Sequence, residues 1–175
     1  MDIQTIILGF LMEKSLTGYD LKQMFSLSFT FFSGISYGSI YPALKKMEKE
    51  GFITTELKIQ ENAPNKKLCT ITQKGRERFS QVLDSPLPEE KFKNAFLSRL
   101  FFFAHLKPEK RGDIVQGYLD QLSQTQAALV AHRPVIEELA DPFQLACFKC
   151  GLRYVEDLKK SITDNVLKIS ENESP

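Results

Sequence analysis

The spacing of hydrophobic residues predicts two helices at the start of the chain. Apolar side chains recur every three or four residues, which places them on one side of a helix. Thr17 is the expected N-cap of the second helix, and Asp20 would lie favourably in its first turn. The expected inner faces consist of Ile3, Ile6, Ile7, Phe10 and Leu11 in the first helix and of Leu21, Met24 and Phe25 in the second.

A third helix is predicted over residues 40–50, although this stretch contains Pro42. A proline in a helix interior removes a backbone hydrogen bond, but in the first turn the backbone N–H has no intrahelical partner to lose. Ser39 is therefore the expected N-cap, residues 36–39 a tight turn, and Gly51 the residue that ends the helix. The buried stripe would be Ile40, Ala43, Leu44 and Met47, and the exposed side would carry Tyr37, Tyr41, Lys45 and Lys49.

After Gly51 the pattern changes from helical spacing to the alternation of β-forming residues. Residues 52–60 and 68–71 are typical of a strand and its return strand, with turn-forming residues over 61–67. Thr72 would cap a further helix, with an inward side made by Phe79, Val82 and Leu83. This order of elements predicts a mostly α fold, in which residues 1–84 form an α+β winged helix-turn-helix domain.

The second half of the chain, residues 85–175, is predicted to be a helical domain for dimerisation. The stretch 84–91 contains two prolines and no periodicity, so we place the domain boundary there. One helix is expected over 90–106, a longer one from Pro108 that Pro134 kinks or ends, and a last one from about residue 143. The expected inner side of the first of these is Phe92, Phe96, Leu100 and Phe103. The last helix carries a near-heptad seam that we interpret as a dimer interface, made by Val155, Leu158, Ile162, Val166 and Ile169. The alternative is a helical cap that packs only on itself.

Composition narrows the class of protein. No apolar run approaches the roughly 20 residues that span a bilayer, and the start of the chain lacks the features of a secretory signal peptide. Three cysteines, an odd number, favour a reducing compartment over a disulfide framework, so we expect a cytoplasmic protein. The net charge is only +1, but residues 58–78 carry six basic side chains against two acidic ones, which favours a specific anionic partner.

The third helix has the features of a DNA recognition helix. Hydroxyl groups at its N-terminal end can hydrogen-bond to base edges, and the lysines that follow can contact phosphates. The polar and basic residues near the hairpin tip suit phosphate or minor-groove contacts. The candidate DNA-binding residues are Ser36, Tyr37, Ser39, Tyr41, Lys45, Lys46, Asn65, Lys66 and Lys67.

The first half of the chain resembles the PadR family of bacterial transcriptional regulators. The resemblance lies in three separated blocks that match in order and spacing, TGYDLKQMF, YGSIYPALKKMEKEGFI and KKLCTITQKGRERF. The remainder, including FKNAFLSRLFFFAHL and GLRYVEDLK, resembles the helical C-terminal domain of the virulence-activator type. The resemblance implies a homodimer that places two winged helices on an inverted-repeat operator. It also implies a sequence-specific regulator, often a repressor, that a small aromatic effector releases from the DNA.

No arrangement of residues points to catalysis. His105 and His132 are the only histidines and have no matching Ser or Cys motif, and no phosphate-binding glycine motif is present. We therefore expect no enzymatic activity, cofactor or metal. Cys147 and Cys150 form a CxxC pair, whereas a zinc site needs about four ligands. Two alternatives stay open: a winged helix that binds protein rather than DNA, and a thiol- or metal-responsive regulator that uses the CxxC pair.

Overall fold

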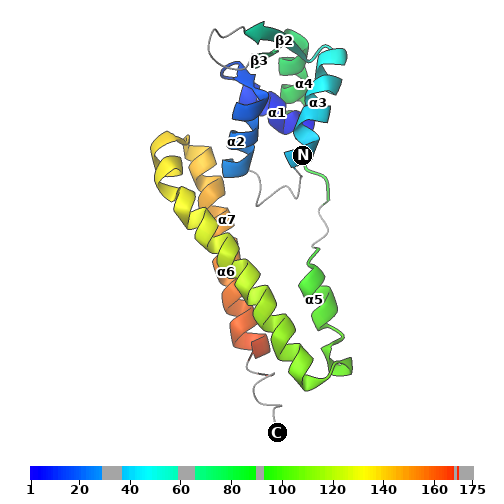
Figure 1. Ribbon diagram of the computed structural model, residues 1–175, viewed down its shortest axis with the longest axis vertical. Coiled ribbons are helices and arrows are strands. Elements are labelled where there is room, and N and C mark those ends of the chain that lie inside the picture. The colour runs from blue at the N-terminus through cyan, green and yellow to red at the C-terminus, as the bar shows by residue number, and fades with distance from the viewer. Residues whose placement is uncertain (29–36, 59–65, 90–92, 168, 170–175) are drawn as a thin grey trace. The chain divides into compact units, whose positions relative to one another are not determined.

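The structure, a computed structural model, describes residues 1–28, 37–58, 66–89, 93–167 and 169. The chain divides into two compact units, Met1–Pro88 and Glu89–Pro175 (Figure 1). The change from one unit to the other falls in the proline-containing stretch 84–91, in which the sequence places a boundary after residue 84. Each unit has a hydrophobic core of its own.

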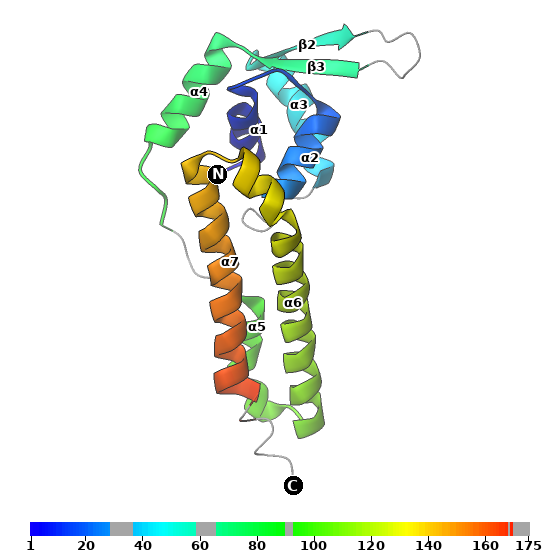
Figure 2. The same ribbon diagram turned by 90° about the vertical axis from the view of Figure 1, so that its left-hand side faces the viewer.

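The first unit is a winged helix-turn-helix, which confirms the predicted fold class. Its elements are α1 (Ile3–Leu11), β1 (Leu16–Thr17), α2 (Gly18–Ser28), the 3₁₀ turn η1 (Tyr37–Ser39), α3 (Ile40–Lys49), β2 (Ile53–Lys58), β3 (Lys66–Ile71) and α4 (Gln73–Asp84). The sheet has the order β1-β3-β2 and is antiparallel throughout. In Figure 2 the strands β2 and β3 extend past the ends of the helices as a two-stranded wing.

Local hydrogen bonds explain where the helices of this unit begin and end. The Thr17 hydroxyl accepts from the N–H of Asp20 at 3.2 Å, as expected of an N-cap, and the Asp20 carboxylate accepts from the N–H of Thr17 at 2.9 Å. Thr72 caps α4 by accepting from the N–H of Gly75 at 3.1 Å. After α3 the chain turns at Gly51, whose φ of 76° is readily adopted only by glycine.

Two expectations for this unit need correction, and one element was not expected. The two-residue strand β1 was not predicted, because two residues are too short to show an alternating pattern. The return strand includes Lys66 and Lys67, which the sequence assigned to the turn, and residues 59–65 lie outside the described residues. Leu83, expected to face inward on α4, is 59% exposed, whereas Phe79 packs against the core.

The second unit is built on two long helices. Its elements are α5 (Ala95–Leu100), the 3₁₀ turn η2 (Phe103–His105), α6 (Pro108–Leu139), α7 (Pro142–Ile162) and the π-helical turn η3 (Thr163–Leu167). Figure 2 shows α6 and α7 side by side as an antiparallel pair. Pro108 occupies the first turn of α6, as expected, and the helix does not end at Pro134 but continues to Leu139.

The single helix expected over 90–106 is wrong. Asn94 caps a shorter helix by accepting from the N–H of Leu97 at 3.0 Å, and this helix, α5, ends at Leu100. The chain then turns at Phe101 and enters η2. Phe96 and Phe103 are buried in the core as expected, and Phe92 lies outside the described residues.

Candidate nucleic-acid interface

Helix α3 separates an apolar and a basic side as the sequence predicts. Its buried residues are Ile40, Ala43, Leu44 and Met47. Tyr41, Lys45 and Lys49 are exposed on the other side. Ser39 stands at the N-cap position with an α-helical backbone, and its side chain makes no capping hydrogen bond, because η1 already leads into the helix. Pro42 is the third residue of α3, where it costs no intrahelical hydrogen bond.

The ring of Tyr41 lies against the start of α2. A Cβ atom at Gly18 would lie 2.8 Å from Cε1 of Tyr41, so the ring occupies space that only glycine leaves open. The residue is nevertheless 54% exposed. A tyrosine whose ring packs on one side while the residue stays exposed can present its hydroxyl to a partner.

The wing contributes a cross-strand pair of lysines. In the register of the sheet Lys58 on β2 lies opposite Lys66 on β3, and both are exposed. Neither forms an ion pair with another described residue. Like charges directly opposite one another destabilise a sheet, and an anion between them would remove that cost. Sequence reasoning did not place Lys58 in the site, because its pairing depends on the strand register.

Lys67 differs from Lys66, because it is engaged within the protein. Its Nζ donates to the Glu48 carboxylate on α3 at 2.9 Å. The same carboxylate accepts from the Thr55 hydroxyl on β2. Lys46, another candidate residue, is exposed, and its Nζ lies 3.8 Å from Oε1 of Glu50, the residue that follows α3.

Two further basic residues of the 58–78 stretch have structural partners. Lys74 Nζ donates to the backbone carbonyl of Glu50 at 2.8 Å and so caps the end of α3. Arg76 Nη1 donates to the carbonyl of Met12 at 3.0 Å and joins α4 to the end of α1. The basic surface is therefore smaller than the count of charges suggests.

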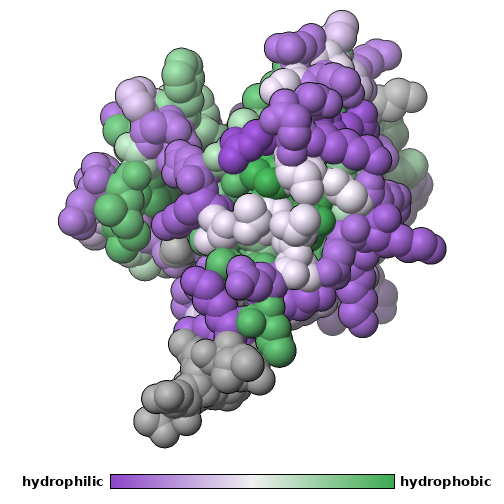
Figure 3. Space-filling view, turned by 90° about the horizontal axis from the view of Figure 1, so that it is seen from above, coloured by the Kyte–Doolittle hydropathy of each residue, from purple (hydrophilic) through white to green (hydrophobic). Residues whose placement is uncertain are grey.

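Three of the candidate residues have no described side chain. Ser36 and Asn65 lie outside the described residues, and Tyr37 is placed only by its backbone in η1. The end of the unit that carries β2 and β3 shows mostly hydrophilic side chains with apolar patches between them (Figure 3).

The predicted seam of α7 is largely used within the second unit. Val155 and Ile162 are buried, and Leu158 and Val166 pack against the core that contains Phe96 and Val115. Ile169 is exposed. Because most of these side chains pack within one protomer, their spacing alone does not assign them to a partner. The dimer interface stays a prediction.

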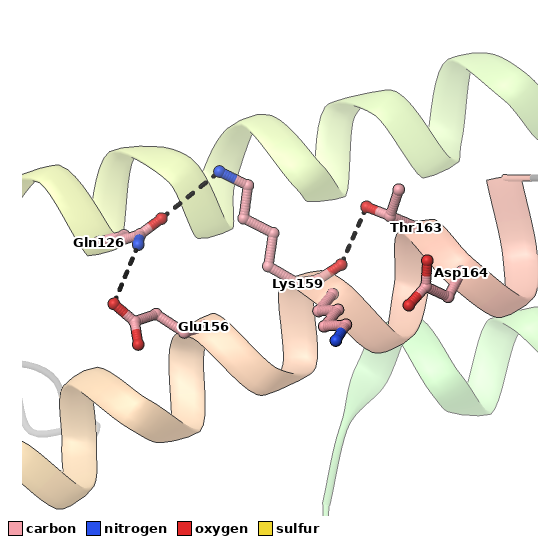
Figure 4. Close-up of a pocket in the computed structure, with 6 residues that line it drawn as sticks. Gln126, Glu156, Lys159, Thr163 and Asp164 are labelled. Atoms are coloured by element: carbon pink, nitrogen blue, oxygen red, sulfur yellow. Dashed lines mark hydrogen bonds between the residues drawn. The ribbon is translucent and has the colours of Figure 1, made fainter.

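A shallow groove of about 320 Å³ lies between α6 and α7. It is lined by Gln126, Glu156, Lys159, Lys160, Thr163 and Asp164 (Figure 4). Gln126 accepts from Lys159 Nζ and donates to Glu156, both at 3.4 Å, so polar groups in the groove already bond to one another. Its lining has no aromatic side chain, whereas pockets for small molecules are predominantly apolar. The groove does not have the character of a site for an aromatic ligand.

The cysteines do not form a metal site within the part of the chain that the structure describes. Cys69 is buried, and Cys147 and Cys150 are exposed on α7. Although the residue as a whole is exposed, partial desolvation of its thiol raises the pKa of Cys147, and the neighbouring Cys150 raises it further. No group of three or more His, Cys, Asp and Glu side chains among the described residues is placed to hold a metal ion. Within the same residues, no helix is both long and apolar enough to cross a membrane.

Comparison with known proteins supports the resemblance seen in the sequence. The model of the PadR-like family of transcriptional regulators matches residues 7–81. The chain is 34% identical over 125 residues to the negative transcriptional regulator PadR of Bacillus subtilis (strain 168), in an alignment that covers 70% of this chain and 66% of that protein.

Solved structures extend the similarity over both units. The PadR-like transcriptional regulator BC1756 from Bacillus cereus has a TM-score of 0.85 and 25% identity, with 98% of this chain and 99% of that chain covered. Bacillus subtilis PadR in complex with operator DNA has a TM-score of 0.81 and 24% identity, covering 96% and 98%. The same protein in complex with p-coumaric acid has a TM-score of 0.75 and 22% identity, covering 97% and 98%. The chain thus belongs to the PadR-like family of transcriptional regulators.

Proposed function

We propose that this protein is a cytoplasmic transcriptional repressor that binds a specific operator as a homodimer. The observation that carries the proposal is the exposed side of α3, with Tyr41 and Lys45, beside a wing that bears the opposed lysines Lys58 and Lys66. Short hydrogen-bonding groups on a helix suit base edges in the major groove, and cations on the adjoining wing suit phosphates. That Bacillus subtilis PadR binds operator DNA supports the same role for this chain.

A homodimer would place two copies of α3 in successive major grooves about 34 Å apart, so the operator would be an inverted repeat with half-sites about one turn apart. Deleting residues 143–175 would remove the predicted interface. It would also remove nearly all of α7 and expose the core of the second unit, so it does not test dimerisation cleanly. Sedimentation equilibrium of the intact chain over a range of concentrations measures the assembly directly. A monomer at the concentrations that occupy the operator would contradict the proposed dimer.

We further propose that a small aromatic compound releases the protein from its operator. The support is the complex of Bacillus subtilis PadR with p-coumaric acid. The polar groove of Figure 4 is not suited to such a ring. Calorimetric titration with p-coumaric acid, followed by operator binding in its presence, tests this part of the proposal.

The deciding experiment compares two duplexes of equal length and composition, the DNA upstream of the protein's own gene and a random sequence. A specific regulator binds the first more tightly, by roughly 10³-fold or more at physiological salt. Equal affinity for both would contradict sequence-specific recognition. A lack of binding to either would favour the alternative of a protein-binding winged helix.

A further inference from the structure

Glu48 connects α3 to both strands of the wing. It lies in the last turns of α3, and its carboxylate accepts from the Thr55 hydroxyl on β2 and from Lys67 Nζ on β3. These two hydrogen bonds hold the pKa of Glu48 below its ordinary value, and the one from Thr55 has the larger effect. One ionised side chain of the helix therefore bonds to both strands of the hairpin.

The contact lies where the wing leaves the hydrophobic core. Ile53 and Ile71, paired at the inner end of the hairpin, are both buried. Leu57, which is paired with Lys67 farther out, is 59% exposed. The hydrogen bonds from Thr55 and Lys67 to Glu48 thus join α3 to the wing where buried apolar pairs give way to exposed ones.

The charges at this point also constrain the DNA-binding surface. An acidic side chain on a recognition helix would repel nearby phosphates unless a cation compensates it, since charges within about 10 Å interact at moderate salt. Lys67 supplies that cation. Glu48 then offsets the charge of Lys67. By contrast, neither Lys58 nor Lys66 forms an ion pair with another described residue, and Lys66 contributes only a long-range charge interaction that helps to lower the pKa of Asp20.

We propose that Glu48 is a positioning residue for DNA binding: it fixes the wing relative to α3 and neutralises Lys67, which leaves Lys58 and Lys66 as the phosphate contacts of the wing. The inference rests on the proposed DNA-binding function. It changes the role of Lys67 from a phosphate contact, as expected from the sequence, to a partner of Glu48.

Hydrogen exchange of the DNA-free protein tests the mechanical part. Glu48→Gln should accelerate exchange of the backbone amides of β2 and β3 near Leu57 and Lys67 by about two- to fivefold, the range expected for a partly exposed ion pair. The matched control is Glu50→Gln, which removes an acidic side chain whose ion pair with Lys46 joins α3 only to the residue that follows it. Unchanged exchange in Glu48→Gln, or equal changes in both variants, would overturn the positioning role.

The salt dependence of DNA binding tests the electrostatic part. Lys66→Ala should flatten the slope of log K against log[salt] by about two units for a dimer. Glu48→Gln should steepen the slope by up to about two, because it frees Lys67 in each protomer. The double variant Glu48→Gln, Lys67→Met removes both charges and should restore the wild-type slope, which a purely structural role of Glu48 does not predict.

A double variant whose slope is flattened as much as that of Lys66→Ala would overturn the assignment of Lys67, because Lys67 would then contact a phosphate in the wild type. A wild-type slope near zero would instead contradict the proposed function, and the DNA role of Glu48 with it. The exchange measurement still decides in that case whether Glu48 holds the wing, so the two failures are distinguishable.

Discussion

Tyr41→Phe and Lys45→Ala should both weaken operator binding, but in different ways. Tyr41→Phe removes one hydroxyl and keeps the ring that lies against Gly18, so the fold of α2 and α3 should not change. If the hydroxyl reaches a base edge, its loss should cost about 1–3 kcal/mol for each half-site on the operator and much less on random DNA. Lys45, which is exposed one turn farther along α3, should contact phosphate.

Lys45→Ala should therefore weaken binding to both DNAs by a similar factor and flatten the salt slope by about two units for the dimer. Fluorescence anisotropy with the operator and a random duplex at one salt concentration measures both effects. Tyr19→Phe is a matched control, because the hydroxyl of this exposed tyrosine on α2 already accepts from Gln23 Nε2 at 3.0 Å. Equal losses on the two DNAs for Tyr41→Phe would refute its role in reading bases.

Three predictions concern stability, measured by urea titration of the full chain. Gly75→Ala should destabilise by about 1–3 kcal/mol, because its Cβ would lie 2.3 Å from the backbone oxygen of Phe52; an unchanged midpoint would contradict this packing. The pKa of Asp20 is lowered by hydrogen bonds from Thr17, so its stabilising effect is present above the ordinary value of 3.8 and is lost as the pH falls through the lower, folded value. Asp20→Asn should thus be less stable than the wild type at pH 7 and should lose less stability on acidification below pH 4; parallel pH profiles would refute the linkage. Asn94→Ala should destabilise the second unit by about 1–2 kcal/mol, through loss of the α5 cap and of the hydrogen bond to the Tyr118 hydroxyl at 2.9 Å, and a change below about 0.3 kcal/mol would contradict both roles.

Local features of the sequence were sufficient to predict α3 and its exposed side. The spacing of Ile40, Ala43, Leu44 and Met47 requires a helix with one buried stripe, and Pro42 is compatible with it only near the N-terminus. The capping roles of Thr17 and Thr72 follow from equally local chemistry.

The hydrophobic periodicity predicted a helix that is too long, because a capping residue inside the stretch starts a shorter helix. Phe96, Leu100 and Phe103 fit one helical stripe, but Asn94 starts α5 inside the expected helix and a turn at Phe101 separates the two aromatic residues. Both phenylalanines still reach the core, from different elements. An apolar pattern indicates which residues are buried more securely than it indicates which of them share a helix.

Contacts between distant residues were beyond the sequence. The pairing of Lys58 with Lys66 depends on the strand register, and that of Glu48 with Lys67 on how the hairpin packs against α3. The seam on α7 shows the same limit, because spacing alone does not tell whether Ile162 packs against its own chain or a partner. Only the structure therefore separates Lys67, which pairs with Glu48, from Lys58 and Lys66, which we propose as phosphate contacts.

The salt dependence of operator binding by the intact protein tests the central claim most directly. Each protomer offers roughly three or four phosphate contacts, from Lys45, Lys58, Lys66 and a helix N-terminus. A dimer should therefore neutralise roughly six to eight phosphates. The slope of log K against log[salt] should then be about −5 to −7. A slope near zero would contradict DNA binding through α3 and the wing, and would make the protein-binding winged helix the better account.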